Sequence, residues 1–259
     1  MYEPWFRADP QAHRVYSITL GRTHAPYVLI LDEDRNTYTT YVRIMQQHPL
    51  TGQWHIVYTH QMDNAVGVQF YNRRWNLTGT PVLVLYSMGI GSGAFLTYEV
   101  LGEERGAIRT YVKENDIFQG SVFFEGTRLI QGSGNQFKVW EKLGGEFVLA
   151  PYQLPIYPGA TVIRYSIPNE NTVRIAKTRY TVPIGGVVQL VREDQKPVSE
   201  RVLTSSDPAC IEYMGISLFR VPCRTNVSIT IIPGGYNWEG AKEITVVTKE
   251  PAGRDKPVA

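Results

Sequence analysis

Apolar and polar residues follow one another in short runs along this chain, and no run keeps a helical period for three turns. β-branched and aromatic residues dominate the runs, and Gly, Asn and Pro separate them roughly every 8–12 residues. Such spacing is typical of β-sandwiches, barrels and propellers. The pattern therefore predicts an all-β protein.

The first twelve predicted strands fall into three groups of four. The groups comprise residues 14–20, 27–31, 38–45 and 54–60, then 66–71, 82–87, 95–101 and 108–113, then 119–124, 127–131, 136–141 and 147–150. They begin about 52 residues apart, and four-stranded units at comparable periods are typical of propeller blades. We therefore expect an N-terminal extension over residues 1–13 and a propeller-like domain of about three units over residues 14–155.

In strand rhythm, residues 14–154 resemble the blade repeats of integrin-like β-propellers. Those repeats often carry an Asp-x-Asp-x-Asp-Gly calcium loop between their first two strands. The corresponding positions here, residues 21–25 and 72–76, lack the carboxylates. The resemblance thus implies a blade-like fold and transfers no calcium site.

Three units are fewer than the roughly 4–8 blades of closed propellers. Open sheet edges must be covered or paired, because they present unpaired N–H and C=O groups. Either the twelve strands form a barrel or sandwich instead, or a neighbouring molecule completes the domain by strand addition. Residues 1–13 contain Trp5 and Phe6 and belong to no unit, so they are the candidate for the donated segment.

The pattern changes after a proline-rich junction at residues 151–158. We expect a linker or joining strand over residues 156–172, a second domain over residues 173–249 and a tail of linker composition over residues 250–259. The two-domain prediction is therefore a propeller-like domain followed by a β-sandwich.

Residues 173–248 resemble the bacterial Ig-like domain, group 2. The matching segments are Val182–Leu190 as the opening strand, with a Gly turn before a valine-rich run, Val202-Leu-Thr-Ser-Ser-Asp-Pro208, the hairpin over residues 211–221, and the last strands over residues 227–231 and 243–247. The Trp that often precedes Ser-Ser-Asp-Pro is absent, and Arg224-Thr-Asn226 stands where a Gly is usual. The resemblance implies a small β-sandwich, common in bacterial surface proteins, adhesins and phage particles, and implies no catalysis.

The two cysteines, Cys210 and Cys223, flank this hairpin symmetrically. In a regular hairpin they would face each other with Cβ atoms about 4.5–5.5 Å apart. That is close to the roughly 3.5–4.5 Å of a disulfide. A disulfide, two buried free thiols and a metal site lacking two ligands are the alternatives.

Charge and hydropathy exclude several classes of partner. The net charge is +2 and only 19% of residues are charged, so nothing favours nucleic acid. No apolar run approaches the roughly 20 residues of a transmembrane helix. Met1 opens no signal peptide, which taken literally indicates the cytoplasm, or else a mature or trimmed chain. The cysteine placement and the tail favour the second interpretation, and hence an extracellular or cell-surface location.

Candidate chemistry is sparse, and we predict neither an enzyme nor a cofactor. None of the five histidines stands in a nucleophile motif. Asp32, Asp34 and Asn36 form the densest set of oxygen ligands, so they are the candidate calcium site, although the downstream Gly and Glu are missing and a solvated turn is the alternative. Trp54 and Trp75 are candidates for stacking on a sugar, with core packing as the alternative.

Together these features predict a non-catalytic extracellular or cell-envelope protein that serves structure or assembly. A subunit of a surface filament or layer, held by self-association or by another envelope protein, is the specific form we expect. One alternative is a module that binds a glycan or envelope polymer for adhesion. Another is an accessory region of a larger secreted enzyme.

Overall fold

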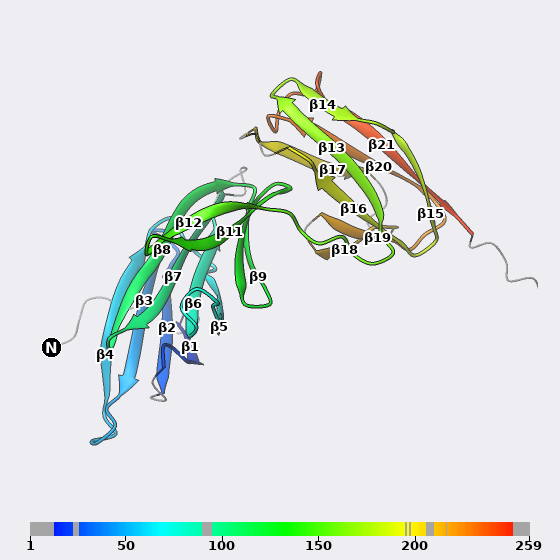
Figure 1. The fold of residues 1–259 in the computed structure, drawn as a ribbon. Helices are drawn as coiled ribbons and strands as arrows, with labels where there is room; N and C mark the ends of the chain where they lie inside the picture. Colours follow the sequence, from blue (N-terminus) through cyan, green and yellow to red (C-terminus); the bar gives the residue numbers. More distant parts are fainter. Residues whose placement is uncertain are drawn as a thin grey trace, which may run out of the picture. The chain divides into compact units, whose positions relative to one another are not determined.

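The computed structural model describes residues 13–22, 26–89, 95–194, 196, 198–205, 210–215 and 217–250. Every regular element among them that spans more than one residue is a β-strand (Figure 1). The all-β prediction is confirmed. Contacts divide the chain into two compact units, the first over residues 1–132 and 138–150, and the second over residues 133–137 and 151–259.

Twelve strands form three sheets of four, in the order of the chain. The first sheet holds β1 (His13–Ile18), β2 (Tyr27–Asp34), β3 (Thr39–Gln47) and β4 (Trp54–Met62); the second holds β5 (Gln69–Arg74), β6 (Pro81–Met88), β7 (Phe95–Glu104) and β8 (Ala107–Phe118); the third holds β9 (Gly120–Glu125), β10 (Arg128–Ser133), β11 (Gln136–Leu143) and β12 (Glu146–Tyr152). Neighbouring strands in each sheet are neighbours in sequence. The grouping matches the sequence prediction, and no sheet closes into a barrel within the described residues.

The second sheet is the middle layer of the first unit. Leu83 and Leu85 of β6 belong to one core cluster with Leu29 and Ile44 of the first sheet. Val84, one residue along, belongs to a second cluster that includes side chains of the third sheet. Because successive side chains on a strand point to opposite faces, the unbroken apolar run of β6 covers both neighbours. The first and third sheets each pack on it by one face.

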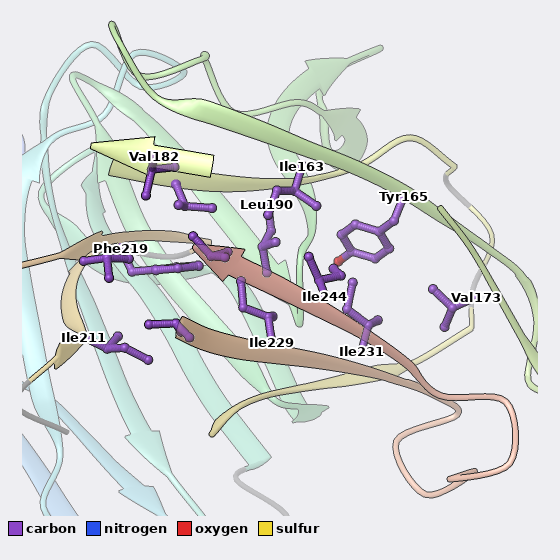
Figure 2. Close-up of a cluster of buried hydrophobic side chains, with 14 of the residues drawn as sticks. Ile163, Tyr165, Val173, Val182, Leu190, Ile211, Phe219, Ile229, Ile231 and Ile244 are labelled. Atoms are coloured by element: carbon purple, nitrogen blue, oxygen red, sulfur yellow. The ribbon is translucent and has the colours of Figure 1, made fainter. Parts of the chain in front are cut away.

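The second unit contains two sheets that share one core. The strands are β13 (Thr161–Asn169), β14 (Thr172–Ile175), β15 (Arg179–Pro183), β16 (Gly186–Arg192), β17 (Glu200–Ser205), β18 (Glu212–Gly215), β19 (Leu218–Val221), β20 (Asn226–Pro233) and β21 (Lys242–Lys249). Their order is β14-β13-β16-β19-β18 in one sheet and β15-β21-β20-β17 in the other. Figure 2 shows Ile163, Leu190, Ile229 and Ile244, from both sheets, meeting in that core.

Two segments differ from the expected boundaries. Residues 156–172, expected as a linker or joining strand, contain β13, whose Ile163 and Tyr165 lie in the core. The opening strand expected over Val182–Leu190 is two strands in different sheets, because the chain turns at Gly185, which has a φ of 77°. Most of the Ser-Ser-Asp-Pro motif, residues 206–208, lies outside the described residues.

Candidate assembly surface

The first sheet has one face that packs on the second sheet and one that does not. In its register Val15 pairs with Ile30, while Val28 pairs with Met45 and Met45 with Ile56. Residues paired in this way share a face of the sheet, and it is opposite to the face of the core residue Leu29. We call it the outer face. Its apolar members are Val15, Val28, Ile30, Met45, Trp54 and Ile56.

The outer face exposes large apolar side chains. Val15 is 55% exposed, Trp54 43% and Ile56 41%. None of the outer-face apolar residues belongs to a core cluster of the described residues. Leu50, in the turn between β3 and β4, is 90% exposed. Ile30, which lies between the two edge strands, is only 9% exposed, so the exposed apolar side chains lie at the two edge strands of the sheet, and the group at β4 is the candidate interaction site.

Strand β4 is also an open edge. Among the described strands it pairs with β3 alone. A bulge places Val57 between the residues paired with Ile44 and Met45, and the segment 54–56 is exposed throughout. Figure 1 shows the β3–β4 hairpin extending past the neighbouring strands at its turn. The free N–H and C=O groups of such an edge can pair with an added strand.

An ion pair lies in the middle of the outer face. Arg43 donates a hydrogen bond to Asp32, and the two side chains are 5% and 2% exposed. The second carboxylate oxygen of Asp32 contacts Nδ1 of His13. Buried charges require such partners, because desolvation of an unpaired one costs several kcal/mol. The outer face therefore has a neutralised, buried ion pair at its centre, and polar residues such as Tyr41, Thr59 and Gln61 lie on the same face.

The far end of β4 is fixed within the first unit by a polar cluster. His60 and Lys113 contact the buried carboxylate of Glu99 at 2.9 and 2.8 Å. Burial raises the pKa of Glu99, but the hydrogen bonds from His60 and Lys113 outweigh it and lower that pKa below 4.5. Nearby, Tyr58 shares a hydrogen bond with Thr110, and burial raises its pKa. Exposure on β4 is thus greatest near Trp54.

The structure separates the residues of the candidate calcium site. Asp32 is engaged by Arg43 and His13, as described above. Asp34 instead accepts the backbone N–H of Asn36 at 2.9 Å, and this bond lowers the pKa of Asp34. No group of three or more His, Cys, Asp or Glu side chains in the described residues could hold a metal ion. The carboxylate of Asp32 therefore forms an ion pair, and the carboxylate of Asp34 stabilises a turn.

The two stacking candidates differ in exposure. Trp54 is exposed on the outer face, as given above. Trp75 is completely buried and stacks on Phe147, with ring centroids 4.9 Å apart. The expectation that Trp75 offers a ring to a sugar is therefore wrong, because both its faces are inside the protein. Core packing, the alternative interpretation, describes this residue.

The remaining predicted residues are placed as follows. Cys210 and Cys223 are joined by a disulfide with Cα atoms 5.1 Å apart. Trp5 and Phe6, the candidates for a donated segment, lie outside the described residues, as does His24. His48 accepts the backbone N–H groups of residues 50 and 51, a role in a turn.

Sequence reasoning missed the pairing of Asp32 with Arg43. Part of a signal existed, because Arg43 alternates with apolar positions in the predicted strand over residues 38–45, and Asp32, one residue past the predicted strand over residues 27–31, lies on the same face as Ile30. Charges on an apolar face need a partner on the adjacent strand. The alternation of apolar and polar residues could thus have suggested that Asp32 pairs with Arg43.

No family model, curated protein or solved structure matches this chain. Within the described residues, no helix has the length and apolarity that a membrane span requires.

Proposed function

We propose that this protein is a non-catalytic subunit of an extracellular or cell-envelope assembly, and that copies associate through the first sheet. The observation that supports this proposal is the outer face with its open edge at β4. Val15, Trp54 and Ile56 are too large and too exposed to be explained by packing within the described part of the chain.

A second copy of the chain is the occupant we propose, and its N-terminal segment is the part that docks. Within the first unit, sheets already pack on one another by apolar faces. Residues 1–12 lead directly into β1, which is the opposite edge strand of the same sheet. They include Trp5 and Phe6, side chains suited to an apolar face. Strand addition at β4 would pair the open edge and place side chains of the added strand beside Trp54 and Ile56.

The disulfide supports the location. Disulfides persist in oxidising compartments and are rare in the cytosol. The bond between Cys210 and Cys223 closes a short hairpin at a separation of 13 residues. A filament or layer outside the cell is the form of assembly that combines this bond with an exposed sheet.

Size-exclusion chromatography with light scattering, over a range of protein concentrations, tests the proposal. The full chain is expected to form oligomers whose mass rises with concentration, and negative-stain electron microscopy should show filaments or sheets. Removal of residues 1–12, or the change Trp54→Ala, should return the protein to a monomer. Circular dichroism spectra of both variants check that they remain folded.

Trp238→Ala is the matched control, because Trp238 is 63% exposed in the second unit and the same atoms are removed. This control should associate like the unaltered protein. A stable monomer at all concentrations, unchanged by removal of residues 1–12, would exclude the assembly proposal. Oligomers that persist in the Trp54→Ala variant would place the contact elsewhere.

A further inference from the structure

A cleft of about 470 Å³ lies in the first unit, lined by residues of the β5–β6, β7–β8 and β11–β12 segments. Tyr111 and Phe147 form an aromatic part of its wall, and Thr78 contributes a hydroxyl. Arg22, which follows β1, completes the lining on one side. No residue of the outer face belongs to the cleft, so what it binds is independent of the proposed assembly.

The aromatic wall is held in place from behind. The rings of Tyr111 and Phe147 have centroids 5.5 Å apart and an interplanar angle of 41°. Buried Trp75 supports Phe147 by stacking at 20° to it. The hydroxyl of Tyr111 donates to the backbone carbonyl of Glu103 at 3.1 Å. Rings fixed in this way lose little conformational entropy when a flat apolar surface packs on them.

Three cationic side chains line the same cleft: Arg22, Arg105 and Lys142. All are exposed and have no ion-pair partner among the described residues, but Nζ of Lys142 lies over the Phe147 ring, 5.5 Å from its centroid. By contrast, Glu104 at the cleft is paired with Arg109 at 3.7 Å. The carboxylates of Glu103 and Glu104 line the cleft as well, so the lining carries one positive charge in excess, and an excess of this sign favours an anionic ligand.

The position of the Arg22 backbone depends on the close contact between Gly21, the preceding residue, and the side chain of Glu103. Gly21 has a φ of 62°, and a Cβ at this position would lie 2.6 Å from the Cβ of Glu103. Only glycine permits this approach between the end of β1 and the end of β7. The glycine thereby brings the Arg22 backbone to the cleft that Arg105 borders.

The cleft also offers groups that bind hydroxyls. The Glu103 carboxylate lines it and accepts a hydrogen bond from Tyr27 at 3.3 Å, which orients one oxygen. Thr78 and Thr80 add polar side chains at the wall. Aromatic faces, acceptors for hydroxyls and unpaired cations together match one chemical class, a sugar that carries acidic groups.

We infer that this cleft binds an acidic oligosaccharide. A sugar ring packs on Tyr111 and Phe147, and its carboxylate or phosphate lies among Arg22, Arg105 and Lys142. Trp75, the stacking candidate from the sequence, supports the wall from inside the protein. The rings that line the cleft, Tyr111 and Phe147, are the ones that we propose stack on the sugar. Carboxylate and phosphate both present negative charge to these side chains, so the experiment separates them by using a probe of each kind.

Isothermal titration calorimetry with defined probes tests the inference. The probes are trigalacturonate for a carboxylate, a galactotriose monophosphate for a phosphate, and neutral galactotriose. We expect one acidic probe to bind at least about tenfold more tightly than galactotriose, and to weaken as salt rises from about 50 to 300 mM. The acidic probe that binds more tightly shows whether the acidic group of the ligand is a carboxylate or a phosphate.

Variants place the binding in the cleft. Arg22→Gln/Arg105→Gln/Lys142→Gln removes the cations, and Phe147→Leu removes the ring; each should weaken the acidic probe by about tenfold or more. The matched control removes three exposed cations outside the cleft, Arg35→Gln/Arg73→Gln/Arg74→Gln, and should bind unchanged. Thermal unfolding checks that every variant is folded.

Three results would overturn the inference. They are the absence of heat with every probe, equal affinity for galactotriose and the acidic probes, and equal loss in the cleft and control triple variants. The last would indicate binding through the overall charge of the protein. None of these results depends on the oligomeric state, so they are distinguishable from failure of the assembly proposal.

Discussion

Arg43 donates a hydrogen bond to Asp32 across the pairing of β3 with β2, on the outer face of the first sheet. Both side chains are almost entirely buried. Removal of Arg43 leaves the buried Asp32 carboxylate with His13 as its remaining side-chain partner, and breaking a buried pair in this way typically costs about 3–5 kcal/mol. We therefore expect Arg43→Met to lower the free energy of unfolding of the first unit by about that amount, as measured by urea denaturation.

Arg35→Met is the control for this change, because Arg35 is exposed in the turn between the same two strands. It should alter the free energy of unfolding by less than about 0.5 kcal/mol. The double change Asp32→Leu/Arg43→Met removes both charges and should recover much of the stability lost in the single variant. Equal effects of Arg43→Met and Arg35→Met would show that the pair does not form.

The Glu99 cluster gives a pH-dependent prediction. The pKa of Glu99 is lowered in the folded protein, so its ionised form stabilises the fold above the ordinary value of 4.5. That contribution is lost as the pH falls below 4.5 and through the folded pKa. Glu99→Gln should therefore destabilise the protein at pH 7, by on the order of 2 kcal/mol, and the difference should shrink below pH 4.5.

Urea denaturation at several pH values between 3 and 7 measures this difference. Glu141→Gln, at an exposed position, serves as the control and should stay close to the unaltered protein throughout. The carboxylate of Glu99 has other ionisable groups around it, namely His60, Lys113 and Tyr58. Because these groups can change the stability of both proteins with pH, the free energy of unfolding of each variant is compared with that of the unaltered protein at the same pH. A constant difference from pH 7 to pH 3 would contradict the assignment.

The strands were predictable because apolar positions and turn residues are local signals. The three predicted groups of four strands match the three sheets. The unbroken apolar run of β6 is the pattern of a strand that is buried on both faces, as in the middle sheet. The division of the expected opening strand at Gly185 into β15 and β16 was harder to predict, because a local pattern does not show that the two strands belong to different sheets. Sheet membership depends on pairing partners far along the chain, as in the parallel pairing of β15 with β21.

The candidate sites were harder to predict for the same reason. Trp75 follows two arginines and looks like part of an exposed turn, but Phe147, distant in sequence, packs on it and closes the core. The cleft cations come from three separate segments, and no local motif joins them. Cys210 and Cys223 could be paired as candidates only because a single short hairpin separates them.

A buried cluster in the second unit gives a further stability prediction. Arg192, with 1% of its side chain exposed, contacts Asp194 at 2.9 Å and Glu200 at 3.4 Å. It also donates to the backbone carbonyl of Val198 at 2.7 Å, so it links β16 to Val198, which lies two residues before β17. Arg192→Met should cost about 3–5 kcal/mol in urea denaturation, against less than about 0.5 kcal/mol for the exposed Arg174→Met. Similar costs for the two variants would contradict the cluster.

The last prediction concerns the bond between Cys210 and Cys223. The oxidised protein should be about 2 Da lighter than the reduced protein in intact-mass spectrometry, and no difference would exclude the bond. Because the bond closes a loop at a separation of 13 residues, its loss should cost about 3 kcal/mol by restoring entropy to the unfolded chain. The variant Cys210→Ala/Cys223→Ala should unfold like the reduced protein and should not respond to reductant. A reductant effect in that variant would mean that the reagent acts elsewhere.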